Sequence, residues 1–163
     1  MMNANANLCC LIASLAERAR DASEGFRLAS EQLTRPADRL QMKRFGAKHA
    51  SHARVLADLA PREDGACTKH ERRLVIARSR VRFVAKRGDH AIFKALRTSE
   101  GEIGEAFIEA LSRGLAIGTH ALLESLFIDV ACQHAWLDRT AGASSSAYPD
   151  NVVSLPVRRP PSA

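Results

Sequence analysis

The sequence predicts an all-α protein, in which four long helices pack side by side and a short basic helix lies in a crossover between the second and the third. Three observations predict this class. The chain of 163 residues is rich in Ala and Leu, which favour helices. Along four stretches, apolar residues recur at alternating spacings of three and four, which marks one inward face on each helix. β-branched runs are short, so little in the chain favours strands.

The first two predicted helices are joined by a short turn. The first covers about residues 7–33, and its inward stripe consists of Leu8, Leu11, Leu15, Ala19, Ala22, Phe26, Ala29 and Leu33. Pro36 suits the first turn of the second helix, because its missing N–H costs nothing there. Asp38 complements the positive end of the helix dipole in the same turn. We expect this helix to end near Ala60, before a loop at 61–67.

Two further long helices are predicted after the crossover. Gly88 and Asp89 are expected to act as a stop and an N-cap for a helix over about 90–113. Its inward stripe consists of Phe93, Leu96, Glu100, Ile103, Phe107 and Ala110. The last helix is expected over about 119–139, and its stripe consists of His120, Leu123, Phe127, Val130, His134 and Leu137. The remaining residues, 140–163, are rich in Ser, Ala and Pro and are predicted to form a disordered tail after a single domain at 7–139.

The charge, the apolar runs and the cysteines of the sequence indicate where the protein is expected to be located and in what redox state. The segment 69–87 contains eight Lys or Arg residues and one acid, so it carries almost all of the net charge of +6. No apolar run reaches the roughly 18 residues of a membrane span, so we expect no membrane partner and a cytoplasmic location. Adjacent Cys9 and Cys10 and the lack of a CxxC pair are typical of reduced thiols rather than of a disulfide framework or a zinc knuckle.

The predicted inward stripes contain polar side chains that can be explained in two ways. His49 and His52 lie one turn apart on the second helix, and Glu100 lies on the third. Helix midpoints put these three near one level, whereas His134 lies about 7 Å from that level at 1.5 Å per residue. The four could bind one zinc or iron ion. Alternatively, each histidine hydrogen-bonds a neighbouring helix, Glu100 pairs with one of them, and the network fixes helix register.

A family resemblance supports the predicted architecture. It is carried by three segments: Asp21-Ala-Ser-Glu-Gly-Phe-Arg-Leu-Ala in helix one, Ser99-Glu-Gly-Glu-Ile-Gly-Glu-Ala-Phe-Ile-Glu-Ala-Leu in helix three, and His134-Ala-Trp-Leu-Asp-Arg at the end of helix four. With the short basic crossover, these segments resemble a family of uncharacterised bacterial four-helix-bundle domains in the ferritin-like clan, over about residues 8–139. The resemblance implies a ferritin-like bundle and an often stress-linked but unassigned role.

The clan commonly holds two metal ions, with single Glu ligands on two helices and Glu-x-x-His on the other two. This chain has His49-x-x-His52 on helix two and Ala131-x-x-His134 on helix four, and Glu24 of helix one is expected to face outward. A di-iron oxidase is therefore not expected. We expect a non-enzymatic bundle with at most a degenerate iron or zinc site in its core. Small residues on the inward stripes would also allow a second copy to pack alongside.

The basic crossover supports an alternative function, which is binding of an acidic partner, either nucleic acid or protein. Such a surface would use Arg72, Arg73, Arg78, Arg80, Arg82, Lys86 and Arg87 to bind phosphates or carboxylates. Phe83 is the one residue of this segment that could stack on a base. The simpler interpretation is a solvated helix whose arginines pair with acids of the protein itself, such as Glu102, Glu105, Glu109 and Asp129.

Overall fold

The structure, a computed structural model, describes residues 4–60 and 77–146, and every secondary-structure element in these ranges is helical. The elements are α1 (Ala4–Gln32), α2 (Pro36–Leu59), α3 (Ala77–Val84), the short 3-10 helix η2 (Ala85–Arg87), α4 (Asp89–Leu111) and α5 (Ile117–Ser146). The predicted all-α class is confirmed for this part of the chain. The basic residues predicted at Lys69, Arg72 and Arg73 lie outside the described residues, and so does the tail from 147 onward.

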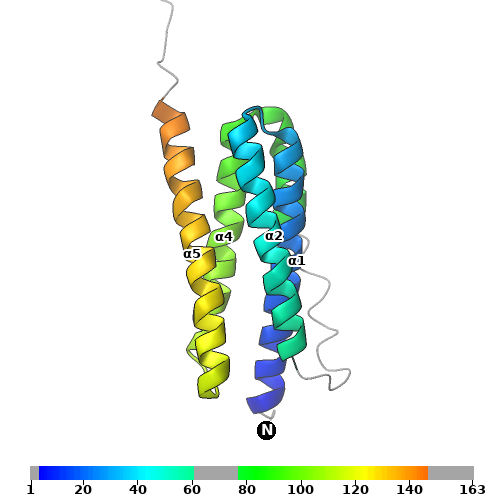
Figure 1. The fold of residues 1–163 in the computed structure, drawn as a ribbon, viewed down its shortest axis with the longest axis vertical. Coiled ribbons are helices and arrows are strands. Elements are labelled where there is room, and N and C mark those ends of the chain that lie inside the picture. Colours follow the sequence, from blue (N-terminus) through cyan, green and yellow to red (C-terminus); the bar gives the residue numbers. More distant parts are fainter. Residues whose placement is uncertain (1–3, 61–76, 147–163) are drawn as a thin grey trace, which may run out of the picture.

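The four long helices lie side by side, as two antiparallel pairs (Figure 1). α1 and α2 form one pair, and α4 and α5 form the other. α2 and α4 begin at the same end of the molecule, where the Asp89 carboxylate accepts hydrogen bonds from the Thr34 N–H at 3.1 and 3.2 Å and from its hydroxyl at 2.5 Å. α4 therefore begins at the end of the molecule opposite to the one where α2 ends.

α3 packs against α1 and α4, so the basic helix of the crossover is anchored to both pairs. At its start, the Asp21 carboxylate on α1 accepts a hydrogen bond of 2.6 Å from the Ala77 N–H. A side chain at Gly25 would place its Cβ 3.1 Å from the Cβ of Ala77, so any larger residue would push α3 away from α1 by a few tenths of an ångström.

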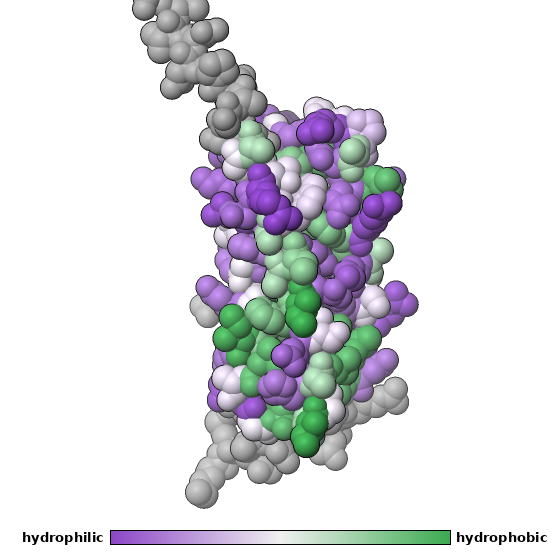
Figure 2. Space-filling model, turned by 60° about the vertical axis from the view of Figure 1, so that its left-hand side comes forward, coloured by the Kyte–Doolittle hydropathy of each residue, from purple (hydrophilic) through white to green (hydrophobic). Residues whose placement is uncertain are grey.

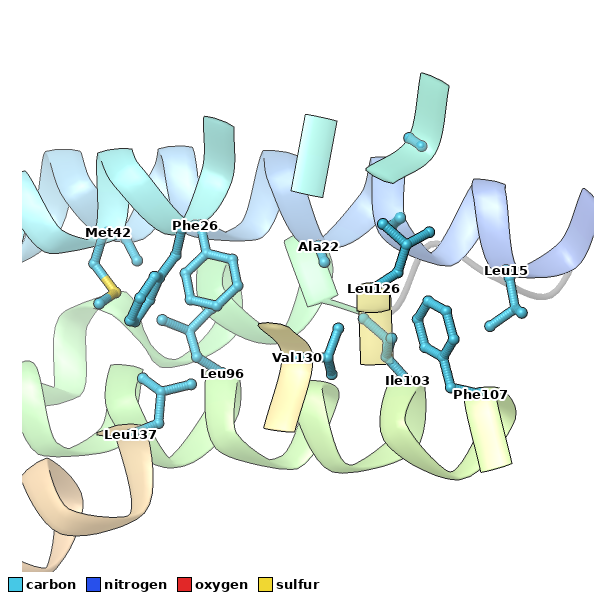
Figure 3. Close-up of a cluster of buried hydrophobic side chains, with 14 of the residues drawn as sticks. Leu15, Ala22, Phe26, Met42, Leu96, Ile103, Phe107, Leu126, Val130 and Leu137 are labelled. Carbon is cyan, nitrogen blue, oxygen red and sulfur yellow. The ribbon is translucent and has the colours of Figure 1, made fainter. Parts of the chain in front are cut away.

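The hydrophobic core lies between the two pairs, as Figure 3 shows. Phe26 and Met42 point from α1 and α2 toward Leu96 on α4 and Leu137 on α5. The predicted inward residues of the first three long helices are buried, apart from Leu8, Leu11 and Leu59 near the helix ends, which are partly buried. Burying them is what makes these helices stable, because a lone amphipathic helix is marginal in water.

Three expectations need correction. α5 does not end near Arg139 but continues to Ser146, and Ala141 is buried. Asp89 does not cap its own helix, because its carboxylate bonds Thr34 instead. Cys10 is disulfide-bonded, so the four cysteines are not all reduced thiols, although Cys9 and Cys132 are free. The cytoplasmic location stays a prediction.

α5 is apolar around most of its circumference. Ile117 of α5 is 90% exposed, and Ile128 of the same helix is also exposed. Ile108 of the neighbouring helix α4 is exposed as well. Figure 2 shows hydrophobic residues gathered over the lower part of the face that α5 forms. Among the described residues, no helix is both long enough and apolar enough to span a membrane.

Candidate functional site

The most unusual feature of the core is a pair of fully buried polar side chains, His49 on α2 and Glu100 on α4. The His49 Nε2 atom lies 2.9 Å from Oε1 of Glu100, and neither side chain has any exposure to solvent. The two atoms are close enough for an ion pair, but they are not oriented for a hydrogen bond. Both are therefore buried without a hydrogen-bond partner. Polar atoms buried in this way cost about 1–3 kcal/mol each unless something satisfies them.

Phe26 of α1 forms one wall of this pair. Its ring stacks on the imidazole of His49, with the ring centroids 5.3 Å apart and the planes 16° from parallel. α1 itself contributes small or apolar residues here, including Ala22. The outward direction expected for Glu24 is confirmed, because its carboxylate pairs with Arg27 on the same helix.

Gln133 on α5 is a third buried polar side chain of the core. It is 2% exposed, and both atoms of its amide lack a hydrogen-bond partner. On α5 it lies between Asp129 and Trp136, which both contact α2. The Trp136 ring packs with its centroid 5.5 Å from that of Phe45, one turn before His49, and Asp129 pairs with His52, one turn after it. His49, Glu100 and Gln133 are thus buried polar side chains from three different helices. We call these three residues the core polar cluster.

His52 continues the polar contacts toward the surface. Its Nε2–H donates to Oδ2 of Asp129 at 3.2 Å, and the Lys48 ammonium donates to Oδ1 of the same carboxylate at 2.6 Å. Burial, followed by the charge of His49, lowers the pKa of His52 below 6.5 against the opposing effect of Asp129. Burial alone would raise the pKa of Asp129, but the hydrogen bonds from Lys48 and His52 outweigh it and hold that pKa below 3.8.

His134 stands apart from the other three predicted ligands. It is half-buried, and its Nε2 atom lies against Gly101 of α4, 3.6 Å from where a Cβ would stand. Among the described His, Cys, Asp and Glu side chains, no three are arranged so that they could hold one metal ion. Glu100 does pair with a histidine, His49, and His52 hydrogen-bonds Asp129 of α5, but the contact of His49 is not a hydrogen bond, so the expected network is present only in part.

The described part of the basic crossover divides into two kinds of arginine. Arg80 is half-buried and donates two hydrogen bonds, of 2.8 and 2.7 Å, to the Glu102 carboxylate on α4. It therefore follows the simpler interpretation, pairing within the protein. Arg82 is exposed, and the Arg87 guanidinium lies 4.9 Å from the ring centre of Phe83.

Sequence reasoning missed Gln133 and assigned Asp129 to the wrong partner. The sequence suggests Asp129 only as a partner for a crossover arginine, whereas in the structure its carboxylate pairs with Lys48 and His52. The signal was present, because the midpoints of the second and fourth long helices fall near Lys48 and Asp129. Gln133 lies one turn further along α5, on the same buried side of the helix as Val130 and Leu137.

Comparison of the chain with models of protein families, with curated proteins and with solved structures finds no match in any of the three.

Proposed function

We propose that this protein is a ferritin-like helix bundle that binds a single zinc or iron(II) ion in its core through His49 and Glu100, without di-metal oxidation chemistry. The observation that carries the proposal is the buried His49–Glu100 contact, whose donor atoms are in reach of one another yet lack hydrogen-bond partners. Two atoms that share one ion, each about 2.1 Å from it, lie roughly 3–3.5 Å apart. A small outward shift of either side chain would admit the ion.

The donor set suits one ion of borderline character. An imidazole nitrogen and a carboxylate oxygen are ligands that zinc and iron(II) accept. We infer that the amide oxygen of Gln133, which is buried without a hydrogen-bond partner, is available as the third donor. A two-metal centre does not fit, because Glu100 is the one carboxylate of this cluster and a two-metal site of the ferritin-like kind needs four.

Metal titration of the purified full chain tests the proposal. Cobalt(II) is added to protein pretreated with a chelator, and visible absorption and calorimetry report the number of ions and their affinity. We expect about one ion per chain, displaced by zinc and lost in His49→Ala and in Glu100→Gln. His120→Ala is the matched control, because His120 is exposed. The absence of binding, or equal binding by His49→Ala, would refute the proposal and leave a purely structural polar cluster.

The role that such a site would serve, including a stress-linked one, stays a prediction from the family resemblance. The same is true of a homo-oligomer.

A further inference from the structure

A second candidate surface lies outside the core, on the exposed side of α3 and η2. Its residues are Arg82, Phe83, Lys86 and Arg87, all exposed, and we call it the α3–η2 surface. Phe83 is 74% exposed, although α3 buries Ala77 and Val81 on its inner side. A phenyl ring left so exposed at this position contributes little to folding.

The three cations of the α3–η2 surface are available for an external anion. Arg80, on the same helix, is already bonded to Glu102. Within the described ranges, by contrast, no carboxylate forms an ion pair with Arg82, Lys86 or Arg87. Unpaired cations concentrated on one short segment attract anionic partners and raise the rate of encounter with them.

The geometry of Phe83 narrows the class of partner. Arg87 lies over its ring at 4.9 Å, and the ring is nevertheless mostly exposed, so the opposite face is open. Bases of a single strand stack on such rings, while neighbouring cations neutralise the phosphates. A duplex hides its bases and an acidic peptide has none, so neither would use the ring.

We propose that the α3–η2 surface binds single-stranded nucleic acid without sequence preference, with Phe83 stacking on a base and Arg82, Lys86 and Arg87 contacting phosphates. The proposal does not depend on the metal site, because these side chains are exposed on a different element from the core polar cluster. Three phosphate contacts give a slope of roughly −2 in the logarithm of affinity against the logarithm of salt concentration.

The test is fluorescence anisotropy of the full chain with labelled oligo(dT) and oligo(U). We expect both to bind, with an affinity about twenty-fold lower at about 200 mM than at about 50 mM NaCl. Arg82→Glu combined with Lys86→Glu should abolish binding. Lys43→Glu combined with Arg44→Glu on α2 is the matched control, because it changes the net charge equally at exposed positions of another helix.

Variants at Phe83 distinguish base stacking from simple charge attraction. Phe83→Ala should lower the affinity about five-fold or more and leave the salt slope unchanged, whereas Phe83→Trp should preserve the affinity. The proposal is overturned if the oligonucleotides do not bind, if the α2 control weakens binding as much as the α3 pair, or if Phe83→Ala has no effect. Equal binding of duplex DNA, or equally effective competition by polyglutamate, would overturn it as well.

Discussion

The core polar cluster allows a double-mutant cycle with a large expected coupling. His49→Leu leaves the Glu100 carboxylate in a site where neither side chain has any exposure. Removing one partner of a buried pair costs about 3–5 kcal/mol of unfolding free energy. Glu100→Leu leaves an imidazole without a partner, which costs about 1–3 kcal/mol.

The double variant, with Leu at both positions, should recover most of this loss. Replacing both members of a buried pair by apolar side chains of similar volume is often neutral, or stabilising by about 1–4 kcal/mol. We therefore expect the double variant to be at least about 3 kcal/mol more stable than His49→Leu alone. Phe26, stacked on His49, offers an apolar wall for the new leucine.

The measurement is urea denaturation at neutral pH, with EDTA present so that no metal contributes, followed by both circular dichroism and tryptophan fluorescence. Trp136 packs against Phe45 in the core and so reports tertiary unfolding. If the two single effects simply add in the double variant, His49 and Glu100 do not interact and the described contact is wrong. Repeating the cycle with zinc should stabilise only the parent protein.

Three further predictions concern stability. Because the pKa of His52 is lowered in the folded protein, the unfolded chain binds the extra proton, so stability is complete above about pH 6.5 and falls below it by at most about 1.4 kcal/mol per pH unit. Denaturation across this range should show a flatter profile for His52→Asn, and an unchanged profile would count against the assignment. Gly46→Ala should destabilise by about 1 kcal/mol in thermal unfolding, because its Cβ would stand 3.2 Å from a backbone oxygen of α1. Gly104→Ala, whose Cβ meets nothing closer than 3.9 Å, should stabilise by up to about 1 kcal/mol, and the opposite order would be contrary evidence. Phe107→Ala should cost about 3–5 kcal/mol in urea denaturation, since Phe107 is wholly buried, and a loss below 1 kcal/mol would show a looser core.

Periodicity predicted the inner faces of α1, α2 and α4 because each carries a single apolar stripe against a polar background. On α2, for example, Met42, Phe45, His49 and His52 are all buried, as their spacing indicates. The same spacing cannot identify partners on other helices. That His49 meets Glu100 follows from how the helices are staggered along one another, which depends on packing across the whole core.

On α5 the spacing of apolar residues does not identify the buried face. The predicted stripe placed Phe127 and His134 inside, whereas the structure buries Leu126 and Gln133 and leaves Phe127 and His134 half-buried. Apolar residues surround most of this helix, so two stripes rotated by one residue fit almost equally well. A buried glutamine gives no hydrophobic signal, so the spacing of apolar residues cannot place Gln133 in the core.

The hydrogen bond between Ser23 of α1 and the Gly46 carbonyl fastens α1 closely to α2, and the crossover helix ties α1 to α4 on one side. On the other side, α2 meets α5 through side chains such as Phe45 and Trp136, with no described element bridging them. Parting of α2 from α5 would have to break both bonds of the Asp129 carboxylate, to Lys48 and to His52. A cation that approaches the core from this side would therefore meet the partly exposed carboxylate of Asp129 before the fully buried one of Glu100.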